Sequence, residues 1–476
     1  MTAVLRLHPL AAISGMRRYV ILLLIPLIRG LTAIGDGWME WLSGAWIDLL
    51  ALAAILLLGI LRWRSSRVFL SDGQLIYERG LFWHTRDVFF AATVSTVRVS
   101  VPWYLRPLRI QLVRLDTRTP PLLTAPSLML HADDLRTLER LFLRARGDRI
   151  QTVVRPRPAA VAATAAATSS LVGGLTFTAA LLSNTVRYAR ETTAGQILTT
   201  AFLFLRKVSL GLPPAVSITA ATLLLAYLAA FLSNLSAYYR FTASRSPRAL
   251  HVSGGLFTRS CFQTPVRQIE SVDLRYGLIS RRFAGVSAYV NAAGLSDGTF
   301  APAIIPTGRL HETMRQLRRL LPELGAFACP IRVQPRCAWR SYLLIPLIGL
   351  LLLAAGSAVS SLLLPDMAGL IAFWAAMLGA AIVWMGLHRL HAMRHSGVGV
   401  EADALCLRYG RGFHFHRVRI AKRTIGSLRI SQNRWQAAHD LCTLHVSEMS
   451  RRRRLHRVRS VPYKALLLAL KKYGYR

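Results

Sequence analysis

The alternation of long apolar segments with basic polar blocks constrains this chain more than any other feature. Six segments approach the length of roughly 20 residues that a helix needs to cross a bilayer. The chain is 53% hydrophobic, yet it carries a formal net charge of +38. A membrane protein combines both properties when its soluble parts lie on the cytoplasmic side, where Lys and Arg are enriched. The segments are Tyr19–Ile34, Leu42–Leu61, Val161–Ser183, Val208–Leu232, Tyr342–Leu364 and Met367–Leu387.

These segments fall into three pairs, and each pair is expected to form a helical hairpin. The connections inside the first and third pairs are short, at 35–40 and 365–366, whereas the second pair is joined by 184–207. The predicted fold class is therefore an α+β membrane protein with six transmembrane helices in three hairpins. The expected boundaries are hairpins at 1–61, 161–239 and 342–387, soluble domains at 62–146, 240–324 and 388–476, and linkers at 147–160 and 325–341.

The polar block after each pair has one common pattern. Short alternating segments punctuated by Gly or Pro come first, which is typical of strands and tight turns. One amphipathic helix then closes each block, at His131–Arg146, Leu310–Leu324 and Tyr463–Arg476. In the first of these, Leu135 and Leu138 belong to an apolar stripe at helical spacing. Each block is thus expected to form a small antiparallel sheet covered by one helix.

The three blocks also align with one another at constant offsets. Gly255 lies 175 residues after Gly80. Val97, Val272 and Leu428 correspond at offsets of 175 and 156, and so do Phe82, Phe257 and Phe413. A constant register over this length predicts one unit, a hairpin followed by a soluble domain, that occurs three times.

The middle block contains Gly255, the triplet Arg267-Gln268-Ile269, the basic pair Arg281-Arg282, Phe283 and Gly285. With these residues it resembles the bacterial pleckstrin-homology-like domain of YdbS/YdbT-type membrane proteins, and the three-fold arrangement resembles the YdbT-like members over nearly the whole chain. The resemblance implies a curved antiparallel sheet capped by one C-terminal helix, and it implies little about activity. The first block departs from the pattern at 91–97 and the third at 421–428.

Charge and cysteine usage predict where the soluble blocks lie. All three basic blocks follow an even number of predicted spans, so they share one side with the N-terminus. The local bias of Lys and Arg favours the cytoplasm for this side, and the bacterial inner membrane for the protein. The five cysteines are scattered and no CxxC occurs, which indicates free thiols in a reducing compartment.

The basic tract at 451–459 and the basic residues of the middle block are the candidate ligand contacts. Attraction to anionic lipid, nucleic-acid binding and a merely solvated hairpin tip remain open for the tract, and its place next to a membrane favours lipid. The same interpretations apply to the basic pair of the middle block. The candidate contacts for anionic lipid or a partner protein are Arg267, Arg281, Arg282, Arg451, Arg452, Arg453 and Arg454.

Two charged residues fall inside the first predicted hairpin. Arg29 lies seven residues before Asp36, and Asp48 lies eight residues after Glu40. At 1.5 Å per residue, both reach a depth of roughly 10–12 Å in the bilayer. A charge inside a membrane usually has a partner, so Arg29 and Asp48 are expected to form an ion pair. A structural clamp and a snorkelling arginine are the alternatives to a functional role.

Patterns that would indicate catalysis or a metal are weak. Residues 294–298 match G-x-S-x-G with Ser296 at the centre, but they lie among short strands, where such a stretch is ordinary turn chemistry. His414 and His416 alternate with phenylalanine, and a metal site would need ligands such as His388, His391 or His395. No catalytic residue, metal ligand or cofactor is assigned, and the chain is not expected to be an enzyme.

These observations favour a non-enzymatic inner-membrane scaffold whose basic domains bind acidic lipid headgroups or an acidic protein. By resemblance, a smaller protein of the same family or a second copy of the chain is an expected partner, and nucleic acid is not. The alternative is a transport or export component with a path between the hairpins. A hydrolase that uses Ser296 is the third hypothesis, and it would require a His and an acid nearby.

Overall fold

The structure is a computed structural model of the 476-residue chain, and the description below concerns only the residues that follow. They are 3–5, 7–12, 38–71, 73–81, 83–117, 127–143, 150–168, 214–278, 285–292, 303–324, 327, 329–333, 335–412, 414–449 and 455–475.

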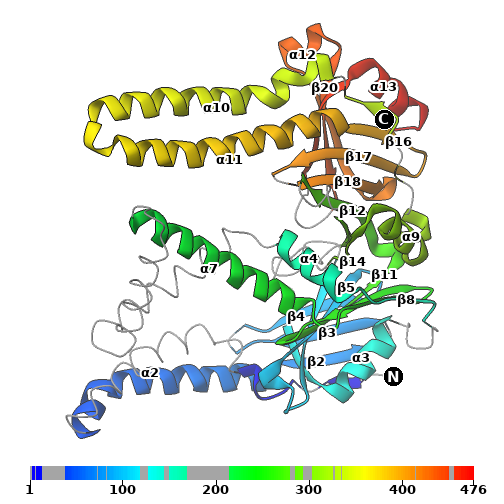
Figure 1. Ribbon diagram of the computed structural model, residues 1–476. Helices are drawn as coiled ribbons and strands as arrows, with labels where there is room; N and C mark the ends of the chain where they lie inside the picture. The colour runs from blue at the N-terminus through cyan, green and yellow to red at the C-terminus, as the bar shows by residue number, and fades with distance from the viewer. Residues whose placement is uncertain are drawn as a thin grey trace.

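Three units follow one another along the described chain, and each has four strands, then three strands, then one helix (Figure 1). Unit 1 consists of β1 (Ala3–Leu5), β2 (Arg67–Ser71), β3 (Gln74–Arg79), β4 (Thr85–Phe90), β5 (Val94–Pro102), β6 (Ile110–Thr117), β7 (Ser127–His131) and α3 (Ala132–Leu143). Unit 2 consists of β8 (Thr152–Val154), β9 (Thr242–Arg245), β10 (Ala249–Gly254), β11 (Thr258–Pro265), β12 (Ile269–Gly277), β13 (Gly285–Ala292), β14 (Ile305–Arg309) and α9 (Leu310–Leu320). Unit 3 consists of β15 (Ile331–Arg332), β16 (Gly397–Val400), β17 (Ala404–Arg411), β18 (His414–Ala421), β19 (Ile425–Ser431), β20 (Leu441–Glu448), β21 (Leu455–Pro462) and α13 (Tyr463–Lys472).

The remaining helices lie between or beside these strands. The short ones are α12 (Arg434–Ala438) and the 3-10 turns at Trp103–Leu105, Val266–Gln268, Pro322–Leu324, Pro365–Met367 and Lys422–Thr424. α4 (Pro158–Thr168) has 11 residues, and the long helices are α2 (Trp38–Arg64), α7 (Pro214–Ala237), α10 (Pro335–Leu363) and α11 (Ala368–His395).

Neighbouring units are joined through shared sheets, which the sequence did not indicate. The last strand of each four-stranded set pairs with the first strand of the three-stranded set in the unit before it. β11 pairs antiparallel with β5, and β18 pairs antiparallel with β12. We call these pairings the first and the second junction. They produce two seven-stranded sheets, ordered β7-β6-β5-β11-β10-β9-β8 and β14-β13-β12-β18-β17-β16-β15.

The units are equivalent down to irregularities of the backbone. A β-bulge interrupts the pairing between Val94 and Thr96 in unit 1, between Ile269 and Ser271 in unit 2, and between Ile425 and Ser427 in unit 3. The three bulges are separated by the same offsets of 175 and 156 residues that align the sequence blocks. A bulge bends its strand and increases the local twist, so each three-stranded set turns away from its sheet at the same point.

A glycine turn before β4 and before β11 shows the same equivalence. Gly80 has φ of +156° and Gly255 has φ of +122°, a region that favours glycine. A Cβ atom at Gly80 would collide with the carbonyl oxygen of Trp83, and one at Gly255 with that of Thr258. Only glycine therefore fits either turn.

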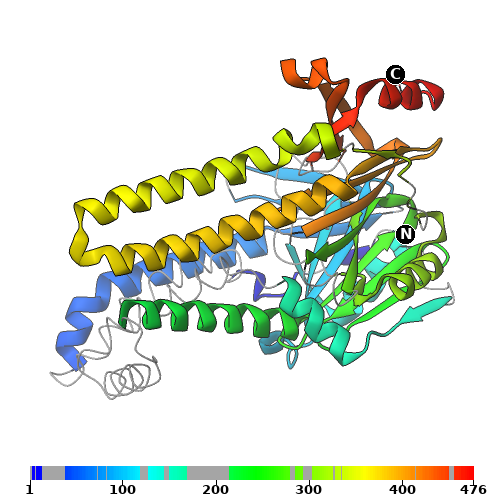
Figure 2. The ribbon, with the colours of Figure 1, turned by 45° about the horizontal axis from the view of Figure 1, so that its top comes forward.

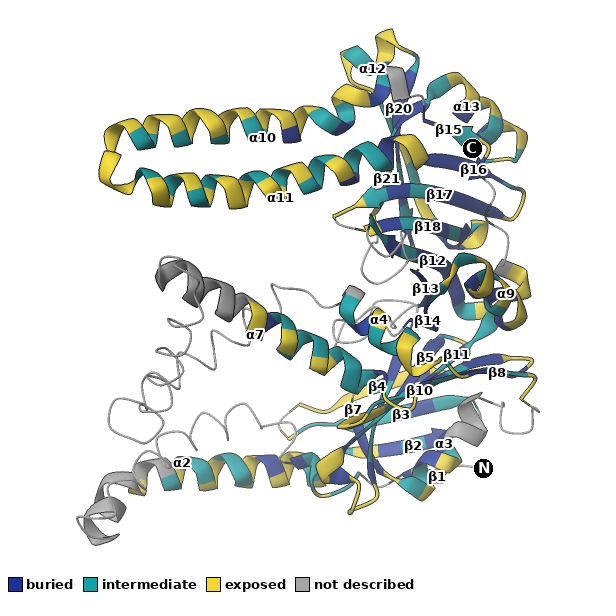
Figure 3. Cartoon of the chain, in the orientation of Figure 1, coloured by how far each residue is buried: buried dark blue, intermediate teal, exposed yellow. Residues whose placement is uncertain are grey.

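The strands and closing helices bury separate apolar clusters. Leu138 of α3, Leu317 of α9 and Leu466 of α13 are fully buried against the sheet of their own unit. One apolar cluster runs through units 2 and 3, and a second fills unit 1. Burial is concentrated in the sheets, while the long helices are largely exposed (Figure 3). The interiors of the three units are thus packed like that of an ordinary globular protein, whereas the long helices leave most of their side chains exposed.

Helices α2, α7, α10 and α11 all project from the same side of the sheets, and α3, α9 and α13 cover the other side (Figures 1 and 2). α10 and α11 pack against each other as an antiparallel hairpin. Their outer surfaces are strongly apolar: Leu351 is 69% exposed and Leu362 is 81% exposed. A long helical hairpin with exposed leucines along its length marks a site of contact with a membrane or another protein.

The prediction of six transmembrane helices in three hairpins is contradicted. Among the described residues, two helices are long and apolar enough to cross a membrane, Cys337–Leu363 and Pro365–His395, and Leu224–Ala237 forms a shorter apolar helix. The segment predicted at 161–183 begins in α4, where Thr164 and Ala165 are completely buried. The Thr164 hydroxyl donates a hydrogen bond to Thr307 Oγ1 of β14 at 2.9 Å, so this start packs on unit 2.

The expected linkers and the first hairpin also contribute to the sheets. β8 lies inside 147–160, β15 lies inside 325–341, and β1 lies inside 1–61. Each of these strands is only two or three residues long and forms the outer strand of its four-stranded set. Short strands give almost no periodic signal, which is why the sequence pattern assigned them to other elements.

Candidate anion-binding pocket at the base of the apolar hairpin

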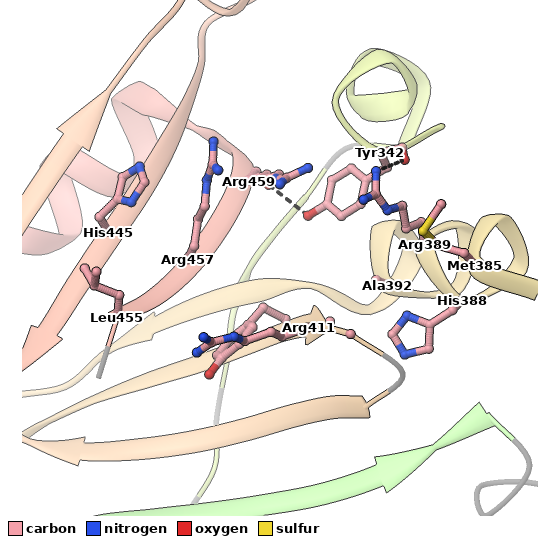
Figure 4. Close-up of a pocket in the computed structure, with 13 residues that line it drawn as sticks. Tyr342, Met385, His388, Arg389, Ala392, Arg411, His445, Leu455, Arg457 and Arg459 are labelled. Atoms are coloured by element: carbon pink, nitrogen blue, oxygen red, sulfur yellow. Dashed lines mark hydrogen bonds between the residues drawn. The ribbon is translucent and has the colours of Figure 1, made fainter. Parts of the chain in front are cut away.

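A cavity of about 480 Å³ lies where the α10–α11 hairpin meets unit 3 (Figure 4). Two helices and three strands form its walls, because the hairpin emerges directly above β17, β20 and β21. We call it the hairpin-base pocket. Its lining residues are Tyr342, Met385, His388, Arg389, Ala392, Tyr409, Gly410, Arg411, Gly412, His445, Leu455, Arg457 and Arg459.

Strand alternation directs the basic side chains of β21 into this pocket. Leu455, Arg457 and Arg459 share one face of the strand and line the pocket. His456 and Val458, on the opposite face, are buried in the core. The pairing of β20 with β21 sets His445 opposite Arg457, which adds a third nitrogen-bearing side chain to the same wall.

Backbone carbonyls at the start of α10 hold two of the four lining arginines. Arg459 Nη1 donates to the Ser341 carbonyl oxygen at 3.0 Å, and Arg389 Nη1 donates to that of Tyr342 at 3.5 Å. The Tyr342 hydroxyl donates to the Arg459 carbonyl oxygen at 3.1 Å, so helix and strand are locked together (Figure 4). These bonds fix the positions of Arg459 and Arg389 without neutralising their charge.

The pocket therefore concentrates positive charge without a counter-charge from the chain. Among the described residues, no Asp or Glu lines it, and none of its four arginines makes an ion pair. Burial lowers the pKa of Arg459, and the neighbouring Arg457 and Arg389 lower it further. Burial, and then Arg457 and Arg429, likewise lower the pKa of His445. An anion in the pocket would relieve this repulsion and favour the charged forms.

His388 adds a buried ring nitrogen to the pocket wall. Its side chain is only 2% exposed, and its ring stacks on Phe415 at 4.1 Å between centroids. Within the part of the chain that the structure describes, its Nε2 atom is buried and makes no hydrogen bond. Gly410 allows this close approach, because a Cβ there would lie 3.2 Å from His388 Cε1. A buried polar atom without a partner usually marks a position that a ligand or water completes.

A chain of hydrogen bonds connects the pocket to unit 2. The Tyr409 hydroxyl lies 2.6 Å from His456 Nδ1, and His456 Nε2 lies 2.9 Å from Glu448 Oε1. Glu448 Oε1 also accepts a hydrogen bond of 2.6 Å from the Ser271 hydroxyl of β12. Glu448 and Ser271 are completely buried, so this network belongs to the packing between units 2 and 3.

Most of the ligand contacts that the sequence predicted fall outside the described residues, namely Arg281, Arg282 and Arg451 to Arg454. Arg29 of the predicted ion pair falls outside them too. Asp48 lies in α2, and its side chain is likewise not described. Arg267 is exposed at the second junction, where its carbonyl oxygen accepts a hydrogen bond from Arg423 Nη2 at 2.9 Å. It lies in unit 2 and does not line the hairpin-base pocket.

The basic tract of unit 3 extends beyond the four arginines that were predicted as contacts. Arg457 and Arg459 continue the run, and their alternation with His456 and Val458 is the signal that would have assigned them to one strand face. Arg389 and Arg411 were missed for another reason. They come from a helix end and a hairpin end that only the fold brings together.

The other patterns have structural roles where they are described. His416 Nδ1 lies 3.0 Å from Asp273 Oδ2 across the second junction. His391 and His395 stack on each other at 4.1 Å between ring centroids. Among the residues that the structure describes, no group of three His, Cys, Asp or Glu side chains is arranged to hold a metal. Ser296 lies outside the described residues.

A four-stranded set, a three-stranded set and a closing helix recur in all three units, and the parts of the chain that a family model matches fall largely in units 1 and 2. The sequence model of the family described as Bacterial PH domain matches residues 20–146 and 196–321, more than half of the 476 residues, and the chain belongs to this family. The two matches begin 176 residues apart and end 175 residues apart, close to the offset between units 1 and 2. No curated protein and no solved structure matches the chain. Domains of this type suggest a role as a binding scaffold.

Proposed function

We propose that this protein is a non-enzymatic scaffold of the bacterial inner membrane, with its soluble units on the cytoplasmic side. The α10–α11 hairpin enters the bilayer, and the hairpin-base pocket binds an acidic lipid headgroup. The observation that carries the proposal is the position of this basic pocket at the root of the exposed apolar hairpin.

Length and exposure support the insertion of this hairpin. The helix Cys337–Leu363 has 27 residues, which corresponds to about 40 Å at 1.5 Å per residue and exceeds the roughly 30 Å hydrocarbon core. Its apolar window is only 6% buried inside the protein, and that of the second helix is 0% buried. The exposed Leu side chains would otherwise face water, at about 25 cal/mol for each Å² of apolar surface.

Electrostatics support an acidic headgroup at the hairpin base. If the hairpin spans the bilayer, the pocket lies at the level of the headgroups, where each basic residue contributes on the order of 1 kcal/mol toward an anionic surface. The side chains of Arg411 and Arg457 have no acidic partner among the described residues, and the buried Nε2 of His388 can complete a bond to a phosphate oxygen. The alternative, a transport path between three transmembrane hairpins, depended on the six-helix arrangement that the structure contradicts.

The test is lipid retention by the full-length chain. The protein is purified in neutral detergent, mixed with phosphatidylglycerol or phosphatidylcholine, and studied by native mass spectrometry. We expect phosphatidylglycerol to be retained preferentially, and the double substitution Arg457→Gln/Arg459→Gln to weaken this retention about tenfold or more, since two charge-assisted bonds contribute well above 1.4 kcal/mol together.

The matched control is Arg315→Gln/Arg318→Gln on α9, which removes the same charge from exposed positions on the side away from the hairpin (Figure 1). This control should retain phosphatidylglycerol as the wild type does. Equal losses in both double variants would mean that only net charge matters. Equal retention of the two lipids by the wild type would contradict the proposal.

A further inference from the structure

Two strand edges remain open at the ends of the array of units, and they are the two partners that the internal junctions use. Within the described residues, β4 pairs only with β3, and β19 pairs only with β20. β4 is equivalent to β11 and β18, whereas β19 is equivalent to β5 and β12. The open edge of β4 in unit 1 is therefore of the kind that pairs with the open edge of β19 in unit 3.

We propose that a second copy of this chain docks through these edges, with β19 of one copy pairing antiparallel with β4 of the next. The contact would complete a third seven-stranded sheet, from three strands of unit 3 and four strands of unit 1 of the partner copy. Its order would repeat that of the two sheets within the chain. The inference rests on strand pairing and is independent of the hairpin-base pocket.

The register of this pairing follows from the two internal junctions. At the first junction Phe262 faces Arg98, and at the second Val418 faces Asp273. The offsets of 175 and 156 residues give the equivalent positions on the open edges: Phe262 and Val418 both correspond to Asp87, and Arg98 and Asp273 both correspond to Arg429. In the proposed contact, Asp87 therefore faces Arg429 of the second copy. Two independent pairings thus specify one register, and in it Val88 faces Leu428.

The chemistry of the open edges fits this register. Asp87 and Arg429 would bring opposite charges together, and directly opposed pairs of this kind stabilise antiparallel strands. On β4, Val88 is 41% exposed and Phe90 is 48% exposed. On β19, Arg429 is exposed and Leu428 is half-buried. The equivalent strands β5 and β12 are almost entirely buried where they are paired.

An open edge with exposed apolar side chains is a template for pairing, and natural proteins usually block such edges. The second copy is the favoured occupant because the complementary edge is present on the same chain. The contact joins two different surfaces, so it is heterologous and extends into a ring or an open row of copies. All long helices project from one side of each copy, so a row built this way keeps its apolar hairpins on one side (Figure 2).

Crosslinking between copies tests the register directly. Full-length Val88→Cys protein is mixed with full-length Leu428→Cys protein in detergent and treated with a mild oxidant, because a disulfide forms only between cysteines whose Cβ atoms lie about 3.5–4.5 Å apart, and wild-type protein gives the background from the native cysteines. We expect a crosslinked dimer in this mixture. We expect clearly less in a control mixture in which the second partner carries Ile430→Cys, because in the proposed register that position shares the face of Leu428 but lies opposite Arg86, diagonally from Val88 at roughly 7–8 Å.

Charge exchange tests the predicted ion pair in the same assay. Asp87→Arg should reduce the dimer about tenfold, because an attractive pair becomes a repulsive one. Adding Arg429→Asp to the same chain should restore it, since each contact then regains opposite charges. A purified wild-type chain that stays monomeric at all concentrations, equal crosslinking in both registers, or no restoration by the exchange would each overturn the proposal.

Discussion

The two junctions share one register but differ in the side chains that meet across them. The contacts at the first junction include a hydroxyl pair and a cation–π contact: Thr96 Oγ1 lies 3.3 Å from Thr264 Oγ1, and the Arg98 guanidinium lies 4.6 Å from the Phe262 ring centre. At the second junction an ionic cluster occupies the equivalent place. Asp273 lies 2.6 Å from Arg275 Nε and 3.0 Å from His416 Nδ1.

One equivalent position makes the difference plain. It is occupied by Arg98 in unit 1, Asp273 in unit 2 and Arg429 in unit 3. The backbone ladder and the bulge set the register in each case, so the side chain at this position is free to differ. Electrostatic chemistry is therefore a property of each junction and not of the fold.

The largest expected effect is at the charged junction. Asp273 is 4% exposed, and its replacement in Asp273→Ala leaves Arg275 and His416 without their carboxylate. Loss of one partner from a buried pair costs about 3–5 kcal/mol. Hydrogen exchange on the full-length chain should show easier opening of β12 and β18, while β5 and β11 keep their protection. A loss of protection spread equally over both junctions would contradict this.

Acid should weaken the second junction next. Burial alone would raise the pKa of Asp273, but His416 and Arg275 outweigh it and hold the pKa below its usual value. The stability from this group is present above the unfolded pKa of about 3.9, and it is lost as the pH falls toward the folded pKa, by at most about 1.4 kcal/mol per pH unit. The difference in thermal midpoint between the wild type and Asp273→Asn should shrink below about pH 4. A constant difference would argue against this carboxylate.

The smallest effect is expected at the first junction. Thr264→Val keeps the shape of the side chain and removes its hydrogen bond to Thr96, which is worth about 1 kcal/mol. Hydrogen exchange of β5 and β11 should change modestly, with no dependence on pH or salt. An effect as large as that of Asp273→Ala would mean that the two junctions are not chemically distinct.

The sequence predicted the repeats better than their assembly. Gly80 and Gly255 could be aligned because a turn that only glycine can occupy leaves a local mark. The pairing of β5 with β11 has no comparable local pattern in the sequence, since it joins residues that are far apart in the chain. It depends on which strand edges are left unpaired within each unit. The apolar stretch at 161–183 was assigned to lipid because hydropathy alone does not distinguish a helix that packs on a sheet, as α4 does through Thr164.

The hairpin-base pocket could not be predicted from the sequence for a related reason. A run such as that at 451–459 is visible in one dimension, whereas Arg389, Arg411 and His388 gather only when a helix end, a hairpin end and a strand meet. The high net positive charge indicated that the protein would bind anions. It did not indicate which of its many arginines would be left without a carboxylate.

Sheet sharing between units also has a consequence for synthesis on the ribosome. β5 ends at Pro102, and the strand that covers it begins at Thr258. At roughly 5–20 residues per second, this edge stays uncovered for about ten to thirty seconds of translation. The nascent chain must protect it for that time from other open strands, including those of neighbouring nascent chains on the same messenger. A chain released too early, after unit 1 alone, would keep this edge permanently and be prone to aggregate.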